Sequence, residues 1–543
     1  MLFNSYEFIL VFLPVTLAGF FLLGARSRRL ALGWLVLASL LFYAWWRPIN
    51  VLIVAPSILI NFALARWLLQ LSAVRGREGL ARSVLLLGIA FNVAFLGYFK
   101  YANFFVSAAN DLTGGNFVLA HVILPLGISF ITFQKIAFLI DIHGRRIEHF
   151  SLGEYALFVL FFPQLIAGPI VHYREVMPQF RLAPCRFDRE DFAVGLTLFV
   201  FGLFKKVVLA DGIAEHVTPL YQLASGGTEV SLVPAWLAAV GFTLQIYFDF
   251  SGYTDMALGL ARFFGVRLPP NFDSPLKATN IIDFWLRWHM TLTRFLTAYV
   301  YNPLVLWLTR RRFARKLPGF GGRTPSFGAF IQLLVAPTLL TMFISGLWHG
   351  AGYLFIVWGV LHGVYICINH AWRLAVARYW CNTSLHARVM KPVGFVLTFV
   401  AVAAAMVLFR SPDADAAGEL LQGMAGLNGI GLPPAIFERL GASGAVLQNF
   451  AFASRELSAQ ALLIGLAWVV GLLTIALALP NTLQVLRSFG PALDMAEARV
   501  GERRYARSFE WRPSLPWAAV MSALAALAIV RLGGRSEFLY WQF

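Results

Sequence analysis

Two histidines, each directly after a tryptophan inside long apolar sequence, are the residues of this chain best suited to chemistry. His289 lies in Phe284-Trp-Leu-Arg-Trp-His-Met-Thr-Leu-Thr-Arg-Phe-Leu296, and His349 lies in Ser345-Gly-Leu-Trp-His-Gly-Ala351. An ionisable side chain is costly to bury in membrane-like surroundings and usually marks a functional site there. Imidazole titrates near neutral pH, so it can accept and return a proton during a reaction.

We predict that His349 is a general base at the floor of a tunnel and that His289 orients or activates an acceptor. Structural roles are the alternatives. His349 could be bonded to a backbone carbonyl, and His289 could be a packing residue or an interfacial one with snorkelling neighbours.

Basic residues around His289 suggest where a donor binds. Lys277, Arg287 and Arg294 could recognise the phosphates of a donor on the cytoplasmic side, whereas simple anchoring by positive charge is the alternative role. The tryptophans before the two histidines, Trp288 and Trp348, are also candidate donor-binding residues.

Asp249 and Asp255 lie deep in apolar sequence, where a carboxylate needs a partner. We expect them to form a hydrogen bond across helices or to pair with an arginine, and a proton relay is the alternative. Asp255 is also a candidate binding residue. No metal site is expected, because the other histidines and the three cysteines lack ligand spacing.

The composition predicts an all-α integral membrane protein. The chain of 543 residues is 59% hydrophobic and only 13% charged, whereas soluble domains carry about 25% charged residues. Apolar runs near the length of about 20 residues that spans a bilayer recur throughout, and we expect about 10–12 crossings, together with re-entrant helices. The runs cover residues 6–24, 31–46, 51–71, 83–107, 118–140, 190–212, 232–250, 328–348, 352–372, 392–409, 460–479 and 514–531.

Positive charge gathers in short loops between these runs. The net charge of +17 comes largely from clusters such as residues 26–29, 75–82, 144–146, 310–316 and 499–512. The positive-inside rule places such loops in the cytoplasm. The charge therefore indicates membrane orientation and contact with lipids, not nucleic-acid binding, since no basic face is interleaved with aromatic residues.

We expect one membrane domain over residues 1–543, in three parts. Residues 1–150 form ordinary spanning helices, residues 151–375 a catalytic core with re-entrant segments, and residues 376–543 further helices with an extracytoplasmic loop at 410–459. The core is set apart by prolines and glycines within apolar sequence, which survive at membrane depth only where protein or water satisfies the backbone. A polar helix is predicted over 281–308, capped by Thr279 or Asn280.

Several motifs together resemble the membrane-bound O-acyltransferases of the bacterial alginate O-acetyltransferase type. Besides the two histidine motifs, they are Met1-Leu-Phe-Asn-Ser-Tyr-Glu-Phe8, Ser129-Phe-Ile-Thr-Phe-Gln134, Phe161-Phe-Pro-Gln-Leu-Ile-Ala-Gly-Pro169, Tyr247-Phe-Asp-Phe-Ser-Gly-Tyr-Thr-Asp255, Pro480-Asn481 and Phe538-Leu-Tyr-Trp-Gln-Phe543. The resemblance runs nearly end to end. Leu286 and Met290 depart from the residues that relatives often have.

The resemblance implies a ring of helices around a central tunnel in the bacterial inner membrane. It assigns His349 and His289 to the family's two histidine positions. It also implies acetyl-CoA as the acetyl donor, with no bound cofactor, and a periplasmic SGNH-type partner within a polysaccharide biosynthesis and export complex. The function expected is O-acetylation of an exopolysaccharide such as alginate, with either a sugar or a partner serine as the acceptor.

Two other functions stay open from the sequence. A related acyltransferase could carry a D-alanyl group or a lipid acyl chain instead of acetyl. A non-enzymatic polysaccharide exporter is the second alternative, although no nucleotide-binding motif supports active transport.

Overall fold

The computed structural model describes most of the chain. The described residues are 1–119, 122–166, 168–182, 185–320, 325–379, 383–448, 450–454, 456–495, 507–534 and 539. Part of the basic loop expected at 499–512 and most of the C-terminal motif at 538–543 lie outside these residues.

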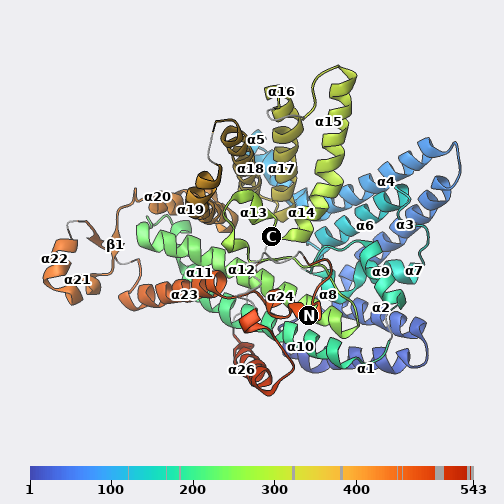
Figure 1. Ribbon diagram of the computed structural model, residues 1–543, viewed down its shortest axis with the longest axis horizontal. Helices are drawn as coiled ribbons and strands as arrows, with labels where there is room; N and C mark the ends of the chain where they lie inside the picture. Colours follow the sequence, from blue (N-terminus) through green and yellow to red (C-terminus); the bar gives the residue numbers. More distant parts are fainter. Residues whose placement is uncertain are drawn as a thin grey trace.

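The N-terminal part consists of helices, two of which contain a π-helical segment (blue to cyan in Figure 1). Their bounds are η1 Phe8–Phe12, α1 Leu13–Gly24, α2 Arg28–Ala44, α3 Ile49–Ser72, α4 Glu78–Leu96, η2 Gly97–Tyr101, α5 Ala102–Thr113, α6 Ile128–His143, α7 Leu152–Leu160, α8 Phe162–Leu165 and α9 Tyr173–Leu182.

The middle part combines long helices with short, broken ones (green to olive in Figure 1). Its elements are α10 Arg189–Phe204, η3 Lys205–Ala210, α11 Asp211–Ser225, α12 Leu232–Phe263, η4 Pro275–Lys277, α13 Ile281–Trp285, α14 Met290–Leu296, η5 Thr297–Tyr301, α15 Asn302–Ala314, α16 Phe327–Phe330, η6 Ile331–Val335, α17 Ala336–His349 and α18 Tyr353–Tyr379.

The C-terminal part is helical except for two short parallel strands. It comprises α19 Thr383–Arg410, α20 Ala414–Met424, β1 Gly431–Leu432, α21 Pro434–Leu440, α22 Ala442–Leu447, β2 Phe452–Ala453, α23 Ala459–Ala478, α24 Thr482–Val485, η7 Arg487–Phe489, η8 Arg507–Phe509 and α26 Leu515–Arg531. The loop expected at 410–459 therefore contains helices and the strand pair.

The number of spanning helices agrees with the all-α membrane fold predicted from the sequence. Among the described residues, eight helices are long and apolar enough to cross a membrane, and two shorter apolar helices, Phe8–Gly24 and Leu515–Arg531, bring the total to the low end of the expected range. The predicted span at 118–140 is wrong in its first part. Gly114 ends α5 in a left-handed conformation, and the next helix begins only at Ile128, after Pro125 and Gly127.

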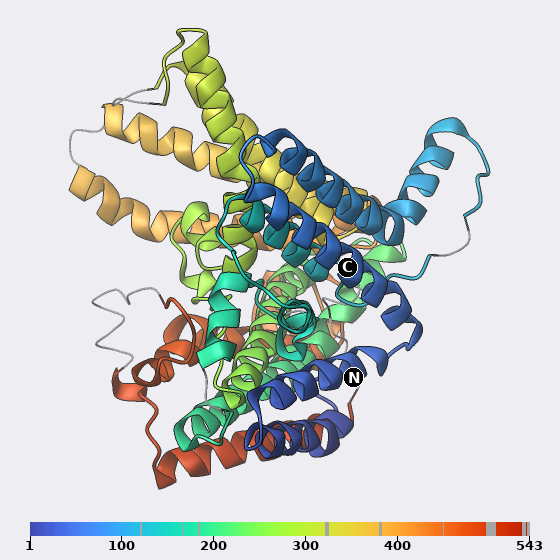
Figure 2. The same ribbon diagram turned by 90° about the vertical axis from the view of Figure 1, so that its right-hand side faces the viewer.

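Helix α12 is the centre of the fold. It packs against α10, α11, α19, α20 and α23, and it lies in the middle of the view in Figure 1. Figure 2 shows the C-terminal helix α26 (red) beside α10 (green) at the edge of the molecule, where the two pack together.

Glycines allow the closest helix contacts. A Cβ atom added to Gly202 on α10 would collide with the backbone oxygen of Gly252 on α12, and one added to Gly346 on α17 would collide with the oxygen of Phe355 on α18. Small residues let helix backbones approach in this way in membrane proteins. The second contact fixes the end of α17, which carries His349.

Candidate active site

His349 is the last residue of α17 and is almost fully buried. Its ring is surrounded by other aromatic rings, with centroid distances of 4.9 Å to Trp348, 5.1 Å to Trp358 and 5.2 Å to Phe409. These apolar walls exclude water from the imidazole. Electrostatic interactions inside such a site are therefore stronger than they would be in water.

Two residues from the N-terminal helices hold the end of α17. Lys100 donates hydrogen bonds to the backbone oxygens of Trp348 and His349, and the Tyr101 hydroxyl donates to the oxygen of Leu347 at 2.6 Å. The last carbonyls of a helix lack partners within the helix, so these side chains cap it. Neither residue was predicted from the sequence, although a lysine inside the apolar run at 83–107 was a detectable signal.

The predicted helix at 281–308 is broken at His289. Helix α13 ends at Trp285, and α14 begins at Met290. His289 has φ +43° and ψ +52°, a left-handed conformation that is uncommon for a residue with a side chain. The cap expected at the start of α13 is confirmed, because the Asn280 side chain accepts a hydrogen bond from the Asp283 N–H.

Asn271, a loop residue that no sequence motif had marked as functional, holds the His289 ring. Its Oδ1 atom lies 2.9 Å from His289 Nδ1, and it also accepts hydrogen bonds from the Thr291 N–H and hydroxyl. The Asn271 backbone oxygen accepts from the Met290 N–H at 3.0 Å. Asn271 thus fixes both the ring and the backbone beside it.

The structure brings the two predicted histidines together. Their ring centroids are 6.3 Å apart, and the Trp348 ring lies 5.8 Å from His289 and 4.9 Å from His349. His289 is fully buried. The residues therefore form one enclosed site in which two imidazoles can act on the same small group.

The basic residues predicted around His289 each have their own partners. Arg287 forms an ion pair with Asp283 at 3.1 Å and also donates to the backbone oxygen of Asp273. Lys277 donates to the backbone oxygen of Leu479 at 2.7 Å. These contacts hold the loop and α13 in place, and a donor-binding role for Lys277 and Arg287 stays a prediction.

Three more predicted candidates have clear neighbours. Trp288 is buried and stacks on Phe284, with ring centroids 5.6 Å apart. Asp255 pairs with Lys205 at 2.6 Å, so its partner is a lysine from the adjacent π-helical segment, not an arginine. Asp249 likewise pairs with Lys206 at 2.6 Å.

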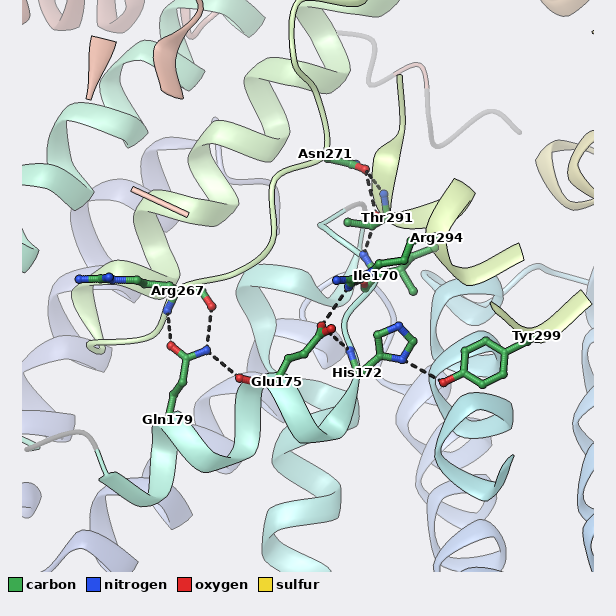
Figure 3. Close-up of polar contacts among 9 residues, drawn as sticks. All are labelled: Ile170, His172, Glu175, Gln179, Arg267, Asn271, Thr291, Arg294 and Tyr299. Carbon is green, nitrogen blue, oxygen red and sulfur yellow. Dashed lines mark hydrogen bonds and ion pairs between the residues drawn. The ribbon is translucent and has the colours of Figure 1, made fainter. Parts of the chain in front are cut away.

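Arg294 belongs to a polar cluster at the start of α9, shown in Figure 3. It pairs with Glu175 at 2.9 Å, and the His172 Nδ1 atom lies 3.0 Å from the Tyr299 hydroxyl. Burial lowers the pKa of His172 to about 4, with further contributions from the positive charges of nearby arginines (Arg294, Arg174 and Arg146). His172 is therefore neutral at physiological pH.

A cavity of about 270 Å³ lies beside this site, between α14, η5, α17 and α18. One end is lined by Trp285 and Ser345, and Ser345 is one helical turn before His349. The other end is lined by Tyr301 and Thr338. Its walls combine apolar side chains with a few hydroxyl groups, as is common in sites for small molecules.

Among the residues that the structure describes, no group of three or more histidine, cysteine, aspartate or glutamate side chains could hold a metal ion.

Comparison with known proteins identifies the family. Residues 92–317 match the sequence profile of the membrane-bound O-acyltransferase family. The peptidoglycan O-acetyltransferase of Helicobacter pylori is 39% identical over 461 residues, which cover 80% of this chain and 81% of the relative. The chain belongs to the membrane-bound O-acyltransferase family. It is a multi-pass membrane protein and an O-acyltransferase.

Two further relatives match at lower identity. The probable alginate O-acetylase AlgI of Pseudomonas aeruginosa is 36% identical over 433 residues, covering 78% of this chain and 75% of the relative. The teichoic acid D-alanyltransferase of Streptococcus thermophilus is 29% identical over 251 residues, covering 46% of this chain and 57% of the relative. The resemblance found from the sequence motifs is thus confirmed.

Proposed function

We propose that this O-acyltransferase moves an acetyl group from cytoplasmic acetyl-CoA across the bacterial inner membrane for O-acetylation of an exopolysaccharide. The observation that carries the proposal is the pair of buried imidazoles, 6.3 Å apart within aromatic walls. The names of the relatives, which include a peptidoglycan O-acetyltransferase and a probable alginate O-acetylase, support acetyl as the group and a polysaccharide as its destination.

His349 is the general base of the proposed reaction. It takes the proton of an acceptor hydroxyl while that oxygen forms a bond to the thioester carbon of the donor. The carbon–sulfur bond then breaks, and the departing thiolate takes the proton back from His349. A backbone N–H or His289 stabilises the oxyanion between these steps, since preorganised donors are most effective in a dry site.

The cavity beside α17 supports entry of the donor from the cytoplasmic side. It extends from Tyr301 and Thr338 toward Ser345, one turn before His349. Its lining residue Tyr301 directly precedes α15, and α15 leads to the basic segment 310–316, which we predict to be cytoplasmic. Trp288 and Trp348, with Lys277, Arg287, Arg294 and Asp255, stay the candidate residues for substrate or donor binding.

A periplasmic SGNH-type protein and the polysaccharide biosynthesis and export complex are the proposed partners, and membrane lipids surround the outer helices. The exposed side chains of Leu86, Leu87 and Val93 on α4 suit contact with lipid.

The proposal can be tested in a strain whose chromosomal gene is deleted and which expresses either the native chain or a variant, with protein levels equalised by blot. The variants are His349→Ala and, as a matched control, His149→Ala, which changes an exposed histidine outside the site. We expect acetyl in the secreted polysaccharide to fall to background only in His349→Ala, because general bases contribute about 10²–10⁴-fold. Normal acetylation by His349→Ala would overturn the mechanism.

D-alanyl transfer is the second candidate, favoured by the similarity to teichoic acid D-alanyltransferases. Membrane vesicles given radiolabelled acetyl-CoA or a carrier-bound D-alanyl thioester separate the two. Consumption of acetyl-CoA alone supports our proposal, and consumption of the D-alanyl thioester alone replaces it. Polymer transport without use of either donor would indicate an exporter.

A further inference from the structure

The orientation of the Asn271 amide is determined by its surroundings. The backbone N–H of Thr291 can only donate, and it points at one atom of the amide at 3.3 Å. That atom must be the oxygen, because the opposite orientation would place two donors against each other. The Thr291 hydroxyl, 2.9 Å from the same atom, is in turn accepting from the Ile170 N–H, so its own proton is directed to Asn271.

The oxygen of Asn271 then determines the tautomer of His289. Because Oδ1 is an acceptor and lies 2.9 Å from Nδ1, the ring must carry its proton on Nδ1. A neutral imidazole has one N–H and one lone pair. In His289 the lone pair is therefore on Nε2, at the ring edge remote from Asn271.

We propose that Asn271 is a positioning residue that holds His289 in its Nδ1-protonated form, so that His289 serves the reaction as a hydrogen-bond acceptor through Nε2 and not as a donor to the oxyanion. This inference rests on the proposed acyl transfer and reduces the choice of group that stabilises the oxyanion. Of the two groups that could stabilise the oxyanion, the neutral His289 ring has no N–H to offer at Nε2, which leaves the backbone N–H. The lone pair of His289 accepts a hydrogen bond from a donor group, such as an acceptor hydroxyl.

The chain holds Asn271 firmly in this orientation. Figure 3 shows Gln179 bonded twice to the backbone of Arg267, four residues before Asn271, with both distances 2.9 Å. On the other side, the Ile170 N–H donates to Thr291 at 3.0 Å, and the Ile170 oxygen accepts from Arg294 at 3.4 Å.

These contacts form one connected system. It runs from the Arg294–Glu175 ion pair through the Ile170 backbone and the Thr291 hydroxyl to Asn271 and His289. Outer partners of this kind fix the tautomer and direction of a histidine ring. Asn271 itself is fully buried, and its Nδ2 donates to no group in the described part of the chain, which is unusual for a residue with only a packing role.

The tautomer can be measured without any assumption about activity. The full chain would be labelled with ¹³C,¹⁵N-histidine in lipid vesicles and studied by solid-state NMR, with the His289 signals assigned by their loss in His289→Gln. We expect Nδ1-protonated His289 in the native chain and a shift toward Nε2 protonation in Asn271→Leu. Nε2 protonation of His289 in the native chain would overturn the inference even if acetyl transfer is confirmed.

Kinetics test whether the tautomer matters for the reaction. We expect Asn271→Leu to lower kcat for acetyl-CoA consumption by about 100-fold, with KM little changed, because loss of the group that orients a catalytic histidine can cost up to roughly 10⁴-fold. Asn271→Asp keeps an oxygen at the same place and should lose much less. In a His289→Gln background, Asn271→Leu should have no further effect.

A matched control comes from Asn92, another fully buried asparagine, which bonds to Asn61 at 2.6 Å in the N-terminal helices. Asn92→Leu removes a buried amide without touching His289, so it should leave kcat unchanged. If Asn92→Leu and Asn271→Leu lost kcat equally, impaired folding would explain both losses, and the positioning role of Asn271 would be overturned. An inactive native chain would count against the proposed function instead, while the NMR result would still decide the tautomer.

Discussion

Helix α12 and the rod formed by α4, η2 and α5 are both long apolar helices, yet their surroundings are opposite. The most apolar window of the rod is 22% buried within the protein, whereas that of α12 is 83% buried although its mean hydropathy is lower, 1.3 against 1.8. Hydropathy therefore identifies helices that leave water, but it does not distinguish a helix that faces lipid from one that faces other helices.

Buried ion pairs mark the difference between the two regions. Helix α12 carries Asp249 and Asp255, each paired with a lysine of η3 at 2.6 Å. The rod instead has exposed leucines and valines over much of its surface, and its partly buried Lys100 donates to backbone oxygens of α17. Mutations that remove a charge or add a methyl group should consequently have large effects at α12 and small effects on the outer helices.

The largest effect is expected from Lys206→Met. This change leaves the Asp249 carboxylate buried without its cation, and loss of one partner of a buried ion pair costs about 3–5 kcal/mol. Thermal unfolding in detergent would show a large fall in Tm. The exposed Arg82→Met on α4 is the control and should change little, and a Lys206→Met/Asp249→Asn double variant should recover part of the loss. An unchanged Tm in Lys206→Met would show that the buried ion pairs do not distinguish α12 from the outer helices.

An intermediate effect is expected from a single methyl group. Gly202→Ala places a Cβ against the Gly252 backbone oxygen, and overpacking of this kind costs about 1–3 kcal/mol. Gly33→Ala on α2 meets nothing within 4 Å; it should be neutral or stabilise the helix by up to about 1 kcal/mol. Comparison of the two Tm values tests the close contact, and equal values would contradict it.

A smaller, pH-dependent effect is expected at His172, inside the central region. Its pKa is lowered to about 4 in the folded protein, whereas an exposed histidine titrates near 6.5. As the pH falls from about 6.5 to about 5, the unfolded chain binds a proton that the folded one does not, so stability decreases with acidification, by about 1–2 kcal/mol.

His172→Asn cannot take up this proton. The difference in Tm between neutral and mildly acidic pH should therefore be smaller for His172→Asn than for the native chain. The same acid sensitivity in both proteins would show that other groups are responsible.

The sequence predicted the helical membrane fold and the two histidines, because long apolar runs and ionisable groups within them are local signals. The Asn280 cap was also predicted from its position. The break at His289 was not, since its left-handed conformation depends on Asn271, which is held in place by Thr291 and a separate segment at Ile170.

Contacts between distant parts of the chain explain the other omissions. Lys100 caps a helix end 248 residues further along the sequence, and no local pattern identifies its partner. We expected an arginine as a possible partner of Asp255, but the partner is Lys205, because the π-helical segment η3 places this lysine against α12. Such pairings become visible only when the packing of helices is known.

The π-helical segment η2 makes the site depend on the number of residues as well as on their identity. A π-helical turn contains one more residue than a regular turn and commonly arises by insertion. Deletion of one residue within Gly97–Tyr101 would restore a regular helix, and the helix beyond it would keep its orientation, because the π-helical turn absorbs the extra residue. Four residues would then occupy the place of five, so Lys100 and Tyr101 could not both keep their positions beside the end of α17. A lineage could in this way lose the support of His349 through a single-codon deletion that leaves both histidines intact.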